Sequence, residues 1–212
     1  EAEVTRPDPQ ELTAVLAVSA PAHRARRRDV RAWLRLRALE GKRVPAWELP
    51  SDGGPGRVVS PGWAVSFPLV VPAYTAVGVV GSLHGRRVAG EGRKSLWLPG
   101  APSRGLIFAD PWLALRALRG EDVGAEGLLI VEGLPDYLTS AAGLAKRWAV
   151  IGVESGSAGA LRAAKLPLVG RVVVATHQDP AGDGYADAVG EALLDGHGLL
   201  YQRAHLEGLR EP

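Results

Sequence analysis

From residue 105 onward, the sequence alternates between short apolar runs and helical segments. The apolar runs have the length of buried strands and cover residues 105–109, 127–131, 148–152, 171–175 and 199–202. The helical segments between them are expected over residues 111–118, 135–146, 157–164 and 183–194. Repeated strand–helix–strand order is typical of a parallel sheet with crossover helices. We therefore predict an α/β fold in this part of the chain.

The residues before this alternation follow another pattern. Two helices are expected over residues 9–19 and 24–39, and a loop rich in proline and glycine over residues 45–56. Four strands are expected at residues 63–71, 76–83, 86–88 and 95–98. Together they predict an antiparallel meander over residues 57–100.

Charge is unevenly distributed along the 212 residues, although the net charge is only +2. Residues 1–50 carry a net charge of +3, residues 51–120 carry +5 and residues 121–212 carry −6. These limits divide the chain into a basic helical segment, a basic α+β subdomain and an α/β domain. A basic front and an acidic back fit a protein that holds a polyanion and cations, while ordinary solvated surface is the alternative.

Composition excludes several classes of protein. The chain has no cysteine, which excludes disulfides, thiolate metal sites and cysteine nucleophiles. No apolar run reaches the ~18 residues of a membrane span, and the acidic first residues do not resemble a signal peptide, so we expect a cytoplasmic protein without membrane association. Because methionine is absent even at position 1, we expect a processed product or a piece of a longer protein.

Acidic side chains follow two of the expected strands where each strand ends. Glu132 directly follows one apolar run, and Asp136 falls in the first turn of the next helix. His177 and Asp179 follow another apolar run, and Asp183 opens the helix after it. In open parallel sheets, binding sites form at the carboxyl ends of the strands. These positions are therefore the candidates for chemistry.

Gathered carboxylates suit a hard divalent cation. Magnesium prefers oxygen ligands and is usually held by one or two carboxylates together with phosphate oxygens. One or two such ions can align a hydroxyl and a phosphate for in-line displacement. The alternative is that Asp136 and Asp183 stabilise helix starts and that Glu132 is a solvated strand end.

The two strand ends resemble the motifs of the Toprim domain, which bacterial-type primases, topoisomerases and some nucleases share. Residues 131–136 (Val-Glu-Gly-Leu-Pro-Asp) match its first motif, a hydrophobic strand that ends in Glu-Gly with an Asp three residues beyond the glycine. Residues 177–182 (His-Gln-Asp-Pro-Ala-Gly) match its second motif, a strand that ends in Asp-x-Asp and continues in primases into Ala-Gly. His177 stands where the family has its first Asp.

The likeness continues upstream and covers roughly residues 57–195. DnaG-like primases carry a basic α+β subdomain before the Toprim domain, and its features occur here in the same order: Phe67-Pro68, Gly85-Arg86, Lys94-Ser95-Leu96 and Gly105-Leu106-Ile107-Phe108. The chain resembles the catalytic core of a primase from a phage, plasmid or other mobile element. The fold implied is a Rossmann-like Toprim domain with a parallel sheet, preceded by a basic α+β subdomain.

The resemblance implies a nucleotidyltransferase that synthesises short primers on single-stranded DNA from nucleoside triphosphates with Mg²⁺ or Mn²⁺. The implied catalytic groups are Glu132, Asp136 and Asp179. The candidate metal ligands are Glu132, Asp179, His177 and Asp183. The expected contacts to template or nucleotide are Arg86, Arg87 and Lys94, together with Arg27, Arg28 and Arg31 on the arginine-rich helix. A helicase or another replication domain is the expected fused or associated partner.

Two other functions stay open at this point. A Toprim nuclease or topoisomerase-like enzyme uses the same motifs, although nothing here offers the tyrosine-bearing partner domain of a topoisomerase. A degenerate Toprim domain that binds nucleic acid without catalysis is the other alternative, because His177 departs from the family pattern.

Overall fold

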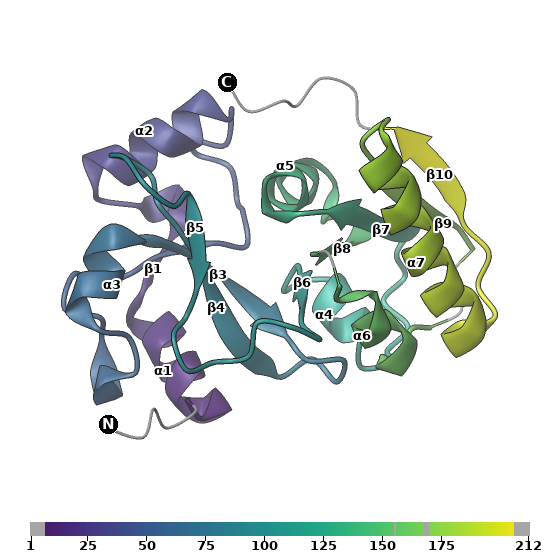
Figure 1. Ribbon diagram of the computed structural model, residues 1–212, viewed down its shortest axis with the longest axis horizontal. Coiled ribbons are helices and arrows are strands. Elements are labelled where there is room, and N and C mark those ends of the chain that lie inside the picture. Colours follow the sequence, from purple (N-terminus) through teal and green to yellow (C-terminus); the bar gives the residue numbers. More distant parts are fainter. Residues whose placement is uncertain (1–6, 155, 168–169, 206–212) are drawn as a thin grey trace. The chain divides into compact units, whose positions relative to one another are not determined.

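The computed structural model describes residues 7–154, 156–167 and 170–205, which belong to two compact units (Figure 1). Of these residues, the first unit comprises 7–73 and Val79–Ser103, and the second comprises Tyr74–Gly78, 104–154, 156–167 and 170–205. This grouping differs from the boundary near residue 120 expected from the sequence, because residues 107–109 pair with a strand of the second unit.

The first unit consists of helices and a small set of antiparallel strands. Its helices are α1 (Pro9–Val18), α2 (Arg28–Leu36) and α3 (Pro61–Ser66), with the 3₁₀ turns η1 (Ala22–Arg24) and η2 (Pro55–Arg57). Its strands pair in the order β1 (Ala20–Pro21), β2 (Trp47–Glu48), β3 (Leu69–Tyr74, whose last residue is counted with the second unit), β4 (Val80–Arg86) and β5 (Ser95–Trp97). Leu12, Val15, Trp63 and Leu83 belong to its apolar core.

Residues 63–66 are helical, so the strand expected over residues 63–71 begins too early. The Oγ atom of Ser60 accepts a hydrogen bond from the backbone N–H of Trp63 at 3.3 Å, and Pro61 occupies the first helical position. A serine cap followed by proline is a strong helix start, and it outweighs the strand propensity of tryptophan and valine. The strand itself begins at Leu69.

The second unit is a five-stranded sheet with helices on both faces (Figure 1). The strand order is β6 (Ile107–Ala109), β8 (Trp148–Val153), β7 (Gly127–Glu132), β9 (Val172–Thr176) and β10 (Gln202–His205). The helices are α4 (Ala114–Ala117), α5 (Leu134–Leu144), α6 (Ala158–Ala163) and α7 (Pro180–His197). Helix α5 covers one face, while α6 and α7 pack together on the other (Figure 1).

The predicted α/β fold class is confirmed, with one departure from the expected parallel sheet. Strands β7, β8, β9 and β10 are parallel to their neighbours, but β6 runs antiparallel to β8. Strands β6 and β7 are consecutive in the chain but are not neighbours in the sheet, because β8 lies between them. An antiparallel strand beside an otherwise parallel sheet is common in such folds.

No helix in the described part of the chain has the length and apolar character needed to cross a bilayer.

A buried histidine in the first unit makes its stability depend on pH. The ring of His84 packs on Trp97 with 4.6 Å between ring centroids, and only 4% of the residue is exposed. Burial, together with the nearby charge of Arg86, lowers the pKa of His84 from 6.5 to about 4. The folded state therefore holds this imidazole neutral.

We expect the free energy of unfolding to fall by about 3 kcal/mol between pH 6.5 and pH 4. Over this range His84 is protonated in the unfolded chain but stays neutral in the folded protein. The contribution is fully present above pH 6.5 and is lost as the pH falls toward 4. Urea unfolding across this range measures it. His84→Phe keeps an aromatic ring against Trp97 and removes the titration, so its pH dependence over this window should be shallower. An equal slope in the variant would contradict the assignment.

Candidate functional site

The first candidate carboxylate lies where β7 ends. The strand buries its apolar residues up to Val131, and Glu132 emerges half-buried at its tip. Gly133 follows with a φ of +73°, a conformation that glycine adopts without strain, and its N–H donates to the carbonyl oxygen of Val153. Helix α5 begins directly afterwards, so Asp136 falls in its first turn, where it is 4% exposed.

The second group of candidates lies where β9 ends and α7 begins. Asp179 caps α7, and its Oδ1 atom accepts a hydrogen bond from the N–H of Gly182 at 2.8 Å. A Cβ atom at Gly182 would collide with the carbonyl oxygen of His177, so the tight turn requires glycine there. The Ala-Gly pair noted in the sequence thus has a steric reason, and it fixes the path of the chain around Asp179.

The topology brings these two ends together. Strand β7 lies between β8 and β9, and the chain turns to β8 on one side and then crosses to β9 on the other. Ligand sites in open α/β sheets form at such a reversal of strand order. Val131 lies opposite Ala175, so Glu132 and His177 leave the sheet near each other.

The pKa of Glu132 responds to the other groups at these strand ends. Burial raises the pKa of the Glu132 carboxyl, the His177 imidazole lowers it, and the carboxylates of Asp179 and Asp136 raise it. The charges of three other predicted groups, His177, Asp179 and Asp136, therefore act on the Glu132 carboxyl.

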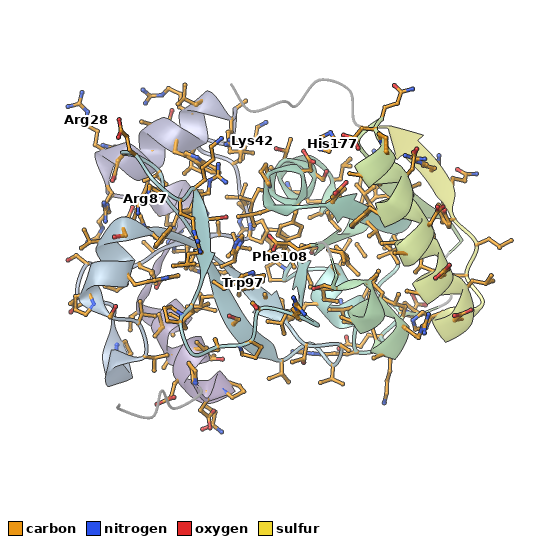
Figure 2. The ribbon with its side chains drawn as sticks, viewed as in Figure 1. Arg28, Lys42, Arg87, Trp97, Phe108 and His177 are labelled. Carbon is orange, nitrogen blue, oxygen red and sulfur yellow. The ribbon has the colours of Figure 1, made fainter. Side chains whose placement is uncertain are left out.

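His177 faces Asp136 rather than open solvent. Its Nε2 atom lies 3.1 Å from Oδ2 of Asp136, and its side chain is 38% exposed at the start of the β9–α7 connection (Figure 2). This contact occupies one ring nitrogen of His177 and one oxygen of Asp136. The predicted metal ligand His177 and the predicted catalytic group Asp136 are thus in contact with each other.

Asp183 is also engaged, by a residue that sequence reasoning missed. The Nη2 atom of Arg203, on β10, lies 2.6 Å from Oδ1 of Asp183. The same guanidinium donates from Nε to Oγ1 of Thr176 at 3.1 Å and from Nη2 to the carbonyl oxygen of His177 at 3.5 Å. No local motif marks Arg203, because its role depends on the pairing of β10 with β9.

The carboxylates that remain can be compared with the ligands that a divalent cation needs. Among the described residues, no set of three or more histidine, aspartate or glutamate side chains is arranged to hold a metal ion. Glu132 has no hydrogen-bond partner among those residues, and no described residue donates to Oδ2 of Asp179. Two carboxylates with oxygen donors are what magnesium or manganese takes when substrate phosphates complete its shell. The donor set thus fits the predicted Mg²⁺ or Mn²⁺.

The residues predicted to contact nucleic acid lie in the first unit and differ in exposure. Arg86 is 8% exposed, and its guanidinium lies 5.6 Å from the ring of Trp33, which Arg37 also covers at 4.7 Å. Arg87 is half-buried and covers Phe67 at 5.1 Å.

The other predicted contacts lie on α2 and beside β5. Arg27 is paired with Asp29 through two hydrogen bonds. Arg28, Arg31 and Lys94 are exposed, and Arg28 extends away from the ribbon (Figure 2). Exposure therefore favours these three for contact with a polyanion, while Arg86 is placed to stack on Trp33.

Comparison with known proteins supports the fold. The chain is similar to a DnaG primase catalytic domain solved bound to single-stranded DNA, with a TM-score of 0.55 and 16% identity over 96% of this chain and 71% of that chain. The chain also aligns with the E. coli primase catalytic core, with a TM-score of 0.48 and 17% identity over 68% of this chain and 46% of that chain. A third alignment is with the zinc-binding and RNA polymerase domains of the Aquifex aeolicus primase, with a TM-score of 0.45 and 19% identity over 68% of this chain and 35% of that chain.

No protein-family model and no curated protein sequence matches the chain. The chain spans about a third of the Aquifex aeolicus structure and less than half of the E. coli core. The order of the strands, the carboxylates at the ends of β7 and β9 and the structural likeness agree with one another. The chain therefore has the Toprim-containing fold of the DnaG-type primase catalytic core.

Proposed function

We propose that this chain is the catalytic core of a primase-type nucleotidyltransferase, which joins nucleoside triphosphates on a single-stranded DNA template. The observation that carries the proposal is the position of Glu132 and Asp179, two carboxylates with uncommitted oxygens at the reversal of strand order in a primase-like fold. We also propose that a helicase is fused to this core or associates with it, and that the protein comes from a mobile element.

In this proposal Glu132 and Asp179 would hold Mg²⁺ or Mn²⁺, which would supply charge neutralisation at the phosphates and alignment of the attacking hydroxyl. The chain's own residues contribute positioning. Gly133 and Gly182 fix the two turns that present these carboxylates. The carboxylates of Asp179 and Asp136 repel the charge of Glu132, and a bound cation would relieve that repulsion. Exposed Arg28, Arg31 and Lys94 attract template and nucleotide.

The test is incorporation of labelled ribonucleotides and deoxyribonucleotides on single-stranded DNA, first with Mg²⁺ and then with Mn²⁺. Primer-length products that depend on the metal and on template support a primase. Cleavage of the template without synthesis supports a Toprim nuclease. Binding without either reaction supports a domain that has lost catalysis.

The contact between His177 and Asp136 favours, as a second candidate, a domain that binds nucleic acid without catalysis. His177 replaces a family acid, and its ring is held by Asp136 at 3.1 Å. A neutral imidazole adds no negative charge for magnesium, and nitrogen suits manganese and other transition ions better. His177→Asp separates the alternatives: increased Mg²⁺-supported synthesis indicates a working but retuned site. If wild type is inactive with both metals and the variant is unchanged, the catalytic proposal should be abandoned.

We expect binding of single-stranded DNA to weaken steeply with salt. Residues 24–43 carry nine basic and two acidic side chains, and each phosphate contact contributes a slope of ~0.7 in log affinity against log salt. Replacing both Arg28 and Arg31 with glutamine should reduce the slope by about 1.4. Arg147→Gln is the control, because Arg147 is exposed in the second unit and paired with Glu126. Fluorescence anisotropy across a salt series measures all three, and an unchanged slope in the double variant would remove α2 from the interface.

A further inference from the structure

We propose that this site holds a single divalent cation, because the guanidinium of Arg203 pairs with Asp183, one of the candidate metal ligands, and supplies positive charge there instead. The inference rests on the proposed function.

The carboxylates at the site divide into two pairs. Oδ2 of Asp136 faces His177, and Oδ1 of Asp183 is 2.6 Å from Arg203. Glu132 and Asp179 retain oxygens that no described residue occupies. A magnesium or manganese ion takes one or two carboxylates. The uncommitted pair is therefore enough for one ion, and a second ion would have to displace His177 or Arg203.

Arg203 is fixed in place by more than the ion pair. Its guanidinium also donates to the hydroxyl of Thr176 at the end of β9 and to the backbone carbonyl of His177. These contacts come from two consecutive residues of the same strand end, so the planar group is held in one orientation with its side chain 28% exposed. Arginine stays charged at all ordinary pH values, so this positive charge is permanent.

A fixed guanidinium has two consequences at this strand end. It neutralises Asp183, which is 61% exposed and would otherwise be a ready oxygen ligand. It also repels a second dication and leaves phosphate oxygens as the favourable partners on that side. Arg203 is thus a positioning and charge-supplying residue, whereas Glu132 and Asp179 are the metal-binding pair.

The test counts bound Mn²⁺ by electron paramagnetic resonance during titration of the full chain with MnCl₂ alone. Wild type is expected to bind one ion. Arg203→Met releases Asp183 and is expected to bind a second, weaker ion. Asp183→Asn added to Arg203→Met should return the count to one. Arg162→Met is the matched control, because Arg162 forms an exposed ion pair with Asp195 between α6 and α7.

Melting curves accompany every variant, and Arg203→Gln serves if Arg203→Met does not fold, because glutamine can keep a hydrogen bond to Thr176 without the charge. Two ions bound to wild type, or only one ion bound to a folded Arg203 variant, would overturn the inference. The proposed function would still stand in that case if wild type synthesises primers. No Mn²⁺ bound to wild type would overturn the inference, and absence of primer synthesis in the separate assay would then also remove the proposed function.

Discussion

Glu132→Gln is expected to reduce metal-dependent primer synthesis at least ~100-fold, since loss of a supporting group beside a metal ligand already costs 10–100-fold and Glu132 is the proposed ligand itself. Glutamine has nearly the same shape, but its amide is a poor ligand for a hard dication. The fold should survive, because Glu132 lies at a strand tip and accepts no hydrogen bond from a described residue. Primer synthesis and Mn²⁺ affinity are measured together.

The control for this variant is Glu191→Gln, which changes an exposed acid on α7 in the same unit. It should leave synthesis, Mn²⁺ affinity and melting temperature unchanged. A Glu132→Gln protein with normal synthesis and an unchanged melting curve would exclude Glu132 as the central metal group. A protein with normal Mn²⁺ affinity but no synthesis would place Glu132 in the chemistry without a role in holding the ion.

Asp110→Ala is expected to destabilise the second unit by about 4 kcal/mol, because it leaves buried amides without acceptors. The Asp110 carboxylate is fully buried and accepts four backbone hydrogen bonds of 2.8–3.1 Å, from Trp112, Leu113, Ala114 and Val150. Burial raises the pKa of Asp110, and these four amides oppose the rise. Asp110 thereby links the end of β6, the start of α4 and the centre of β8.

The size of this effect follows from the exposure of the four donors. Trp112 and Leu113 are partly exposed, so their amides can reach water in the variant. Ala114 and Val150 are buried, and each unsatisfied buried amide costs about 1–3 kcal/mol. Urea unfolding measures the loss. Asp122→Ala is the control, because Asp122 is exposed and accepts one hydrogen bond from Gly124, so its effect should stay within about 1 kcal/mol. Equal effects in both variants would contradict a special role for Asp110.

The strand–helix alternation and the positions of the acids could be predicted from the sequence. Glu132 and Asp179 follow apolar runs that are buried as β7 and β9, and a buried run ends where polar residues return to solvent. That pattern is local, so periodicity reports it. The helix over residues 61–66 differs from the predicted strand for a related local reason, because the helix-start signal of Ser60-Pro61 competes there with the strand propensity of the aromatic and branched residues that follow.

The partners of the site residues were decided by the tertiary structure. Arg203 meets Asp183 because β10 pairs with β9, and Asp110 meets Val150 across 40 residues of sequence. Strand β4 likewise places Arg86, a predicted contact to template or nucleotide, against Trp33 of α2. The order of residues along the chain determined which acids stand at strand ends. Strand register and helix packing determined which of them are neutralised, because they bring together charges that are distant in sequence.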